Sequence, residues 1–167
     1  MDTLTTSITI YGPVKKGNWG KFYLDAKIFA AELGYALNYY GYTSSSHNST
    51  KMTKISKTDA KLLAKLDDDT VSHITLESLP VDFSTAAFDY DLMIVRNQEF
   101  ITLVVNSSDF EKIDLKAVIT TFSKYSNVTE IQVYEMNRDE SPLIFASKAN
   151  PISCFPSLKM LSSEKQF

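Results

Sequence analysis

The spacing of apolar residues in the first half of the chain predicts short strands around one long helix. Residues 6–12 alternate as a strand does, with Ile8 and Ile10 on one side. Residues 20–37 predict a helix, because Phe22, Ala26 and Phe29 recur at helical spacing on one face. Further elements are expected as extended segments at 39–42 and 51–55, a short helix after Ser56 and a strand at 71–77.

The second half has a clearer pattern, dominated by hairpins. Residues 100–105 are almost all apolar, which is typical of a central strand covered on both faces. Ser108 and Glu111 form a capping box for a helix reaching Tyr125. Other expected strands are 86–95, 128–136 and 142–147, and the tail from residue 150 onward lacks a regular pattern.

Together these elements predict an α+β fold. We expect one domain over residues 1–150, with a mixed and largely antiparallel sheet on which two main helices and one short helix pack. Residues 151–167 are expected to form an irregular C-terminal arm packed on that domain. A length of 167 residues and a hydrophobic fraction of 44% suit a single core.

Composition removes several classes of protein. The lone Cys154 excludes a disulfide framework, and two histidines exclude a metal site made of histidines alone, so no metal and no cofactor is expected. The opening MDTLTTSITI does not resemble a signal peptide. No stretch approaches the roughly 18 apolar residues of a spanning helix. These features predict a cytoplasmic protein without a membrane partner.

Charge is distributed unevenly, although the net charge is only −3. Residues 1–66 carry +5 and residues 67–140 carry −10. Such asymmetry favours a charged partner. The run Asp67, Asp68 and Asp69 follows the short helix directly, where negative charge opposes the helix dipole. Because local folding does not require it, the run is a candidate partner-binding element, with an Asp-rich turn as the alternative.

The loop GPVKKGNWG resembles a phosphate-binding loop only in part. Gly12 and Gly17 have the required spacing, but Asn18 and Trp19 stand where Lys and Ser or Thr would contact phosphate and magnesium. We therefore exclude a nucleoside triphosphatase and expect a turn capped by Asn18, with a weaker anion site at Lys15, Lys16 and the helix N-terminus as the alternative.

Two histidine motifs offer an enzymatic alternative. His47-Asn48-Ser49 and His73-Ile74-Thr75 resemble the H-x-T pairs of two-histidine phosphoesterases, in which each imidazole serves as acid or base. His73, Thr75 and Glu77 share one face of the expected strand. Only 26 residues separate the histidines, which is short for that family. No catalytic residue is assigned on this basis.

Two other clusters are candidates for binding. The lysine stretch between Lys51 and Lys65 lacks arginine, stacking aromatics and a known nucleic-acid module, so a solvated lysine face is expected and no nucleic acid. Aromatic residues of the kind that anchor interfaces gather around the first helix. They are Trp19, Tyr39, Tyr40 and Tyr42.

Without a convincing catalytic set, protein–protein binding is the favoured function. The opening ITIYGPVKKGNWGKFYLDAKIFAAEL and the later hairpin–helix–hairpin layout resemble immunity proteins of bacterial polymorphic toxin and contact-dependent inhibition systems. The resemblance implies a non-catalytic inhibitor that blocks the active site of one cognate toxin domain, for which a basic nuclease would suit an acidic surface. The alternatives are a phosphoesterase-like enzyme using His73 and Thr75, or a phage or plasmid inhibitor of a host factor.

Overall fold

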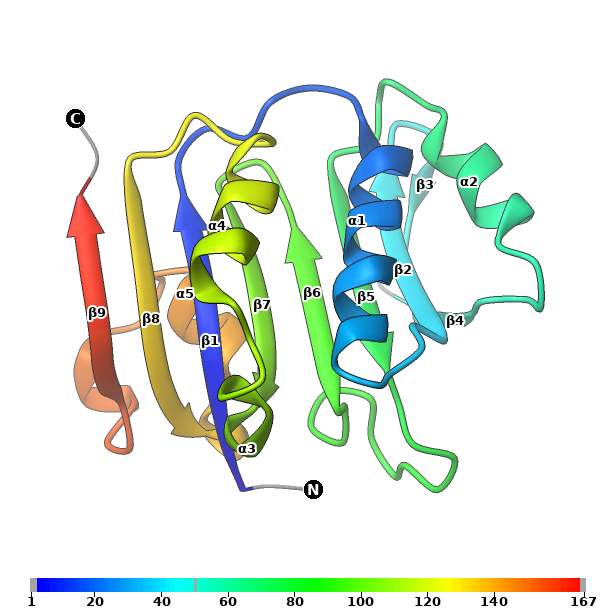
Figure 1. Ribbon diagram of the computed structural model, residues 1–167. Coiled ribbons are helices and arrows are strands. Elements are labelled where there is room, and N and C mark those ends of the chain that lie inside the picture. The colour runs from blue at the N-terminus through cyan, green and yellow to red at the C-terminus, as the bar shows by residue number, and fades with distance from the viewer. Residues whose placement is uncertain (1–2, 50, 166–167) are drawn as a thin grey trace.

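A single nine-stranded β-sheet carries helices on both faces within residues 3–49 and 51–165, the part of the chain that the computed structural model describes (Figure 1). The strands are β1 (Leu4–Tyr11), β2 (Tyr39–Ser44), β3 (His47–Asn48), β4 (Thr53–Lys54), β5 (His73–Ser78), β6 (Leu92–Arg96), β7 (Phe100–Asn106), β8 (Glu130–Asn137) and β9 (Lys159–Lys165). The helices are α1 (Trp19–Glu32), α2 (Ala60–Leu66), α3 (Ser107–Phe110), α4 (Leu115–Ser123) and α5 (Pro142–Ala146), with 3-10 turns η1 (Arg138–Glu140) and η2 (Ile152–Cys154).

The strand order confirms the expected α+β class. It runs β3-β2-β5-β6-β7-β1-β8-β9, with β4 paired to β2, and neighbouring strands in the described residues pair antiparallel. β1 lies between β7 and β8, so Ile8 stands opposite Leu103 on one side and Val133 on the other. Strand β7 is buried along its whole length, as the apolar run at 100–105 predicts.

The main core lies between the sheet and the pair α1 and α4, which cover the same face (Figure 1). Phe22 and Phe29 point from α1 towards Phe122 of α4, with ring centroids 5.7 Å and 6.1 Å apart in edge-to-face geometry. Their spacing along α1 is the one that the sequence predicts for its core face.

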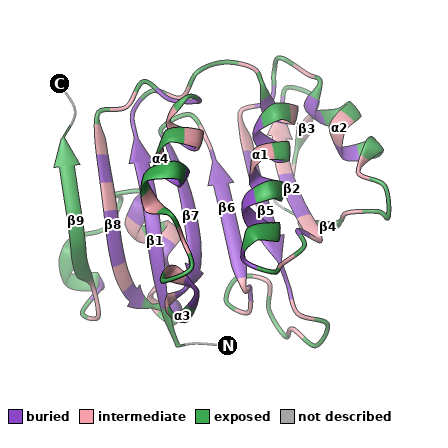
Figure 2. Ribbon diagram, viewed as in Figure 1, coloured by how far each residue is buried: buried purple, intermediate pink, exposed green. Residues whose placement is uncertain are grey.

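The opposite face of the sheet has a smaller apolar layer. Helix α5 and residues 79–91 cover it, and α5 lies behind β1 and β7 in Figure 1. Figure 2 shows the result: β1, β6 and β7 are largely buried, whereas β9 at the edge is exposed throughout.

Helix α1 is shorter than the expected 20–37. It ends because Gly34 adopts φ 86°, while Gly34 N donates to Ala31 O and Tyr35 N donates to Ala30 O. This pair of bonds is a Schellman motif, which only a residue that tolerates positive φ closes easily. At the other end Asn18 is the N-cap, but through its left-handed backbone (φ 58°) and not through its side chain.

The expected helix at 108–125 is two helices. α3 stops at Phe110, and Asp114 starts α4 by accepting a hydrogen bond from Ala117 N at 3.2 Å. The Asp109 carboxylate is held by Tyr35 Oη at 2.6 Å and Lys112 Nζ at 2.9 Å, which fixes the break between the helices.

The expected strand at 86–95 begins only at Leu92. Before it, the Asp89 carboxylate accepts hydrogen bonds from Ser84 N at 2.6 Å and Thr85 N at 2.7 Å. These bonds close residues 84–89 into a loop, so the backbone is not available for sheet pairing there.

Two expectations for the C-terminal part are wrong. Residues 142–147 are not a strand, because Pro142 occupies the first turn of α5 and Ser141 Oγ accepts from Ile144 N at 3.4 Å. The arm expected at 151–167 is not irregular over its described residues 151–165, since β9 pairs with β8 and places Glu164 opposite Ile131, and residues 166–167 lie outside the described part.

Candidate protein-binding surface

The outward face of α1 carries an apolar stripe. Leu24 and Ile28 are 44% and 60% exposed, and Ala31 is also exposed. Their positions i, i+4 and i+7 form one continuous row on a helix. This row lies on the side of α1 opposite Phe22 and Phe29, so α1 has apolar residues on both its core face and its outer face. Because the three side chains form one continuous row, this stripe is a candidate interaction surface.

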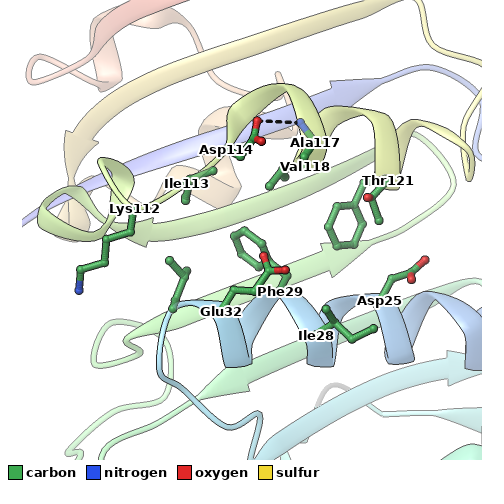
Figure 3. A pocket seen from close by; sticks show the side chains of 12 residues that line it. Asp25, Ile28, Phe29, Glu32, Lys112, Ile113, Asp114, Ala117, Val118 and Thr121 are labelled. Carbon is green, nitrogen blue, oxygen red and sulfur yellow. Dashed lines mark hydrogen bonds between the residues drawn. The ribbon is translucent and has the colours of Figure 1, made fainter.

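Beside this stripe, α1 and α4 diverge to form a groove of about 250 Å³ (Figure 3). Figure 3 shows Ile28 and Phe29 approaching it from α1, with Val118 approaching from α4. Most of the residues that line the groove are apolar: they are Ile28, Phe29, Leu33, Ile113, Ala117, Val118 and Phe122.

The rim of this α1/α4 groove is mainly acidic. Asp25 and Glu32 contribute from α1 and Asp114 from the start of α4, against Lys112 as the only lining cation among the described residues. Asp25 is engaged by Lys124 Nζ at 2.8 Å and by a hydrogen bond from Tyr125 Oη. Glu32 is exposed and has no ion pair within the described residues, so its charge is free to meet a partner.

A second depression, of about 340 Å³, lies at the N-terminal end of α1. The predicted run Asp67, Asp68 and Asp69 lines it together with Trp19, so the structure brings these four predicted residues to one place, and Lys21 is a lining cation beside them. Asp68 accepts hydrogen bonds from Thr70 N at 2.8 Å and Thr70 Oγ1 at 2.7 Å, which lower the pKa of that carboxyl. Asp67 and Asp69 have no ion pair within the described residues. We call this the acidic depression.

The predicted aromatic residues do not form one surface. Trp19 and Tyr40 are only 4% and 5% exposed. Tyr42 packs on the helix side of the sheet, where its ring stacks on His47 at 4.3 Å. Tyr39 lies on the other side, against Phe83 at 5.6 Å. Trp19, Tyr40 and Tyr42 therefore support the helix-bearing side from within, and Tyr39 is separated from them by the sheet.

The two histidine motifs are also separated by the sheet. His73 Nε2 is hydrogen-bonded to Thr75 Oγ1 at 2.8 Å, and burial lowers the pKa of His73. Residues 73 and 75 face away from the main core, because their neighbour Ile74 points into it. His47 lies on the core side with Tyr42. The two imidazoles therefore cannot act on one phosphate group.

The first half of the glycine loop has its backbone donors occupied, at Gly12, Val14 and Lys15. Gly12 N donates to Glu99 O at 3.1 Å, and Lys15 N donates to Tyr125 O at 2.8 Å. The buried guanidinium of Arg96 donates hydrogen bonds to the carbonyl oxygens of Lys15 and Gly17, at 2.8 Å and 3.0 Å. The loop is thus a structural turn, in agreement with the missing phosphate-loop residues.

Sequence reasoning missed the α1 stripe, although the signal was present. The spacing of Leu24, Ile28 and Ala31 is readable directly from the chain.

Comparisons with protein families, curated proteins and solved structures found no match for this chain. Among the described residues, no helix has the length and apolarity needed to cross a membrane. Function therefore has to be inferred from the surface itself.

Proposed function

We propose that this chain is a non-catalytic protein-binding module that docks a basic partner across α1. The observation that carries the proposal is the exposed stripe of Leu24, Ile28 and Ala31 along α1, which borders the α1/α4 groove at Ile28 on the helix whose N-terminal end carries the acidic depression. A standard interface buries roughly 800 Å² on each partner. One helical stripe offers less, so the interface includes both flanking depressions.

The two parts of this surface have different tasks. Ile28 and the apolar groove accept an anchoring side chain of the partner, where desolvation supplies most of the affinity. Glu32, Asp67 and Asp69 supply a negative field that attracts a basic surface and speeds the encounter.

Inhibition of a toxin fits this surface. A nuclease that binds nucleic acid needs a basic active-site groove, and an acidic surface with an apolar anchor is complementary to such a groove. An immunity protein acting on a basic toxin domain is thus our specific proposal. An inhibitor of a host factor would use the same surface and differs only in the identity of the partner.

Site-specific photocrosslinking in the native cell tests the proposal. A benzoylphenylalanine residue at Ile28 is expected to capture a basic protein. The same residue at Ile152 is the matched control, because Ile152 is also highly exposed (70%) but lies in η2, away from α1. Capture from both positions, or of an acidic protein from Ile28, would contradict the proposal.

The captured partner then allows an affinity measurement. Replacing both Leu24 and Ile28 by Ser should weaken binding by about tenfold or more, the effect of losing about 1.4 kcal/mol at an apolar anchor. The free energy of unfolding should change by less than about 0.5 kcal/mol, since both side chains are exposed in the free protein. Unchanged affinity in this variant would place the interface elsewhere.

A further inference from the structure

The lysine stretch between Lys51 and Lys65 plays no part in the proposed interface, and the structure gives it a definite shape. Three of its lysines, Lys54, Lys61 and Lys65, line one cavity of about 150 Å³ between β4 and α2. The remaining lining residues are Tyr40, Thr53, Ile55, Ser56 and Leu62. Within the described part of the chain no carboxylate lines this lysine pocket, although the chain as a whole is acidic.

The three lysines have no internal counter-charge. None of them forms an ion pair within the described residues. Asp59, at the start of α2, is committed elsewhere: it accepts from Lys27 Nζ at 2.7 Å and from Tyr23 Oη at 3.1 Å. Lys61 and Lys65 are also four residues apart on α2, a spacing at which like charges repel. The stability of the fold does not require these unpaired lysines to lie close together.

One of the lysines is held in place by aromatic residues. Lys65 Nζ donates a hydrogen bond to Tyr40 Oη at 2.9 Å and lies 5.4 Å and 5.9 Å from the ring centroids of Tyr40 and Tyr42. This contact with Tyr40 raises the pKa of Lys65, so the ammonium stays charged. Lys65 is therefore positioned before any ligand arrives.

Tyr40 keeps a donor for a ligand. Its hydroxyl oxygen accepts from Lys65, so the hydroxyl hydrogen remains available to an acceptor in the cavity. Thr53 stands directly opposite Tyr40 in the pairing of β2 with β4, which places its hydroxyl on the same face of the sheet as Tyr40. Ser56 Oγ donates to Thr58 O at 2.6 Å and adds no donor of its own.

We propose that the lysine pocket binds a phosphate group, as inorganic phosphate or as a small phosphate monoester. The ammonium groups of Lys61 and Lys65, with the hydroxyls of Tyr40 and Thr53, are a donor set for an oxyanion that carries two charges and several acceptor oxygens. Lys54 stands opposite Tyr39 in the pairing of β2 with β4, so its side chain leaves from the other face of the sheet and is not counted among these donors. A volume of about 150 Å³ is below the roughly 300 Å³ at which pockets for whole drug-sized ligands begin. The site thus accommodates the phosphate group and leaves the rest of a monoester in solvent.

Titration followed by nuclear magnetic resonance tests the site, with inorganic phosphate and phosphoserine as the two probes. Saturable shifts are expected at the backbone amides of residues 53–56 and 61–65. Binding of both probes indicates that the phosphate group is the recognised chemistry. Binding of inorganic phosphate alone restricts the site to the free ion, and binding of phosphoserine alone restricts it to monoesters. Serine itself should produce no shifts.

Variants separate a site from a general charge effect. The double variant Lys61→Gln and Lys65→Gln should weaken phosphate binding by about tenfold or more, because two charge-assisted hydrogen bonds are lost. Tyr40→Phe should weaken it by several-fold while keeping the ring contact with Lys65. Lys116→Gln, on the exposed face of α4 outside this pocket, is the charge control and should change the affinity less than twofold.

Two results would overturn the proposal. One is the absence of saturable shifts at millimolar phosphate, with the fold intact by circular dichroism. The other is equal weakening in Lys116→Gln and in the double lysine variant, which would show that only the net charge matters. Neither result bears on the crosslinking test of the α1 surface, so the two proposals stand or fall separately.

Discussion

The guanidinium of Arg96 lies 4.0 Å from the centroid of the Trp19 ring, and it does so without a carboxylate partner among the described residues. Arg96 is fully buried, and burial lowers its pKa to about 10. Backbone carbonyls of the glycine loop, at Lys15 and Gly17, take the place of a counter-ion. Arg96 therefore connects β6 to the loop that starts α1, and so fixes one end of the proposed binding surface.

Replacing Arg96 with Met should destabilise the glycine loop that precedes α1. The loop carbonyls lose their donor, and the aromatic rings around the guanidinium lose a cation–π partner, so we expect unfolding to become easier by about 2 kcal/mol. Trp19 is the only tryptophan of the chain, so its emission reports on the loop directly. It should shift to longer wavelength as water reaches the indole.

Chemical denaturation followed by fluorescence measures both effects. Lys116→Met is the control, because it removes one positive charge from an exposed position on α4 that does not line the depression around Trp19. Unchanged emission in the Arg96→Met variant would mean that the loop holds its shape without the arginine.

Glu77 makes the free energy of unfolding depend on pH. It is 4% exposed, and its Oε2 has no hydrogen-bond partner among the described residues. Burial raises its pKa from 4.5 to about 7. The folded state thus binds more protons than the unfolded state between these values. Stability is fully present below about pH 4.5 and falls as the pH rises through about 7, by about 3 kcal/mol in total.

Substitution by Gln isolates this effect. The difference in unfolding free energy between Glu77→Gln and the wild type should grow with pH and level off above roughly pH 8. Taking the difference removes the contribution of His73, whose pKa is lowered by burial and whose effect has the opposite sign. Glu99→Gln, at an exposed position, should give a flat difference. A flat difference for Glu77→Gln as well would mean that this carboxyl is solvated.

The histidines should be dispensable for binding. A His47→Ala and His73→Ala double variant loses the bond to Thr75, which predicts a loss of about 1 kcal/mol in stability. Its affinity for the captured partner should match the wild type, because neither imidazole lines the α1/α4 groove or the acidic depression. Lost affinity in a variant that is still folded would move a functional role to the β5 face.

How far the sequence predicts the fold depends on whether an element has an apolar face. Strand β7 is covered on both sides, so its continuous apolar run identifies it. Strand β9 is exposed on both sides and carries no such pattern, so only the open edge of β8 makes it a strand. Helix α5 was predicted as a strand from its apolar residues, although Ser141 and Pro142 are ordinary signals for the start of a helix.

The candidate site also has one part that residue spacing predicts and another that depends on tertiary packing. The α1 stripe is a local pattern and can be found from residue spacing alone. The meeting of Trp19 with the run Asp67–Asp69 is not local, because it depends on how α2 packs beside the start of α1. The burial of Tyr40 also follows from tertiary packing: composition identifies aromatic residues but not the side of the sheet on which each one lies.

The last prediction concerns the acidic depression. Asp67 and Asp69 are to be changed to Asn, while Asp68 is kept because its carboxylate holds the turn through Thr70. The free energy of unfolding of the protein without its partner should stay the same or rise slightly, because Asp67 is the C-cap of α2 and its charge opposes the helix dipole. Association with the captured partner should slow at low salt, and its decline with added salt should become shallower.

Stopped-flow association measured over a range of salt concentrations provides this comparison. The control variant changes Asp82 and Asp139 to Asn, which removes the same charge from exposed positions that do not line either depression. If the control slows association as much as the Asp67 and Asp69 variant, only net charge steers the partner. If neither variant changes the rate, the acidic run is a solvated turn, and attraction to a basic partner has to come from the rim of the α1/α4 groove. A selective effect at Asp67 and Asp69 places the partner over the N-terminal end of α1, next to the loop that Arg96 holds.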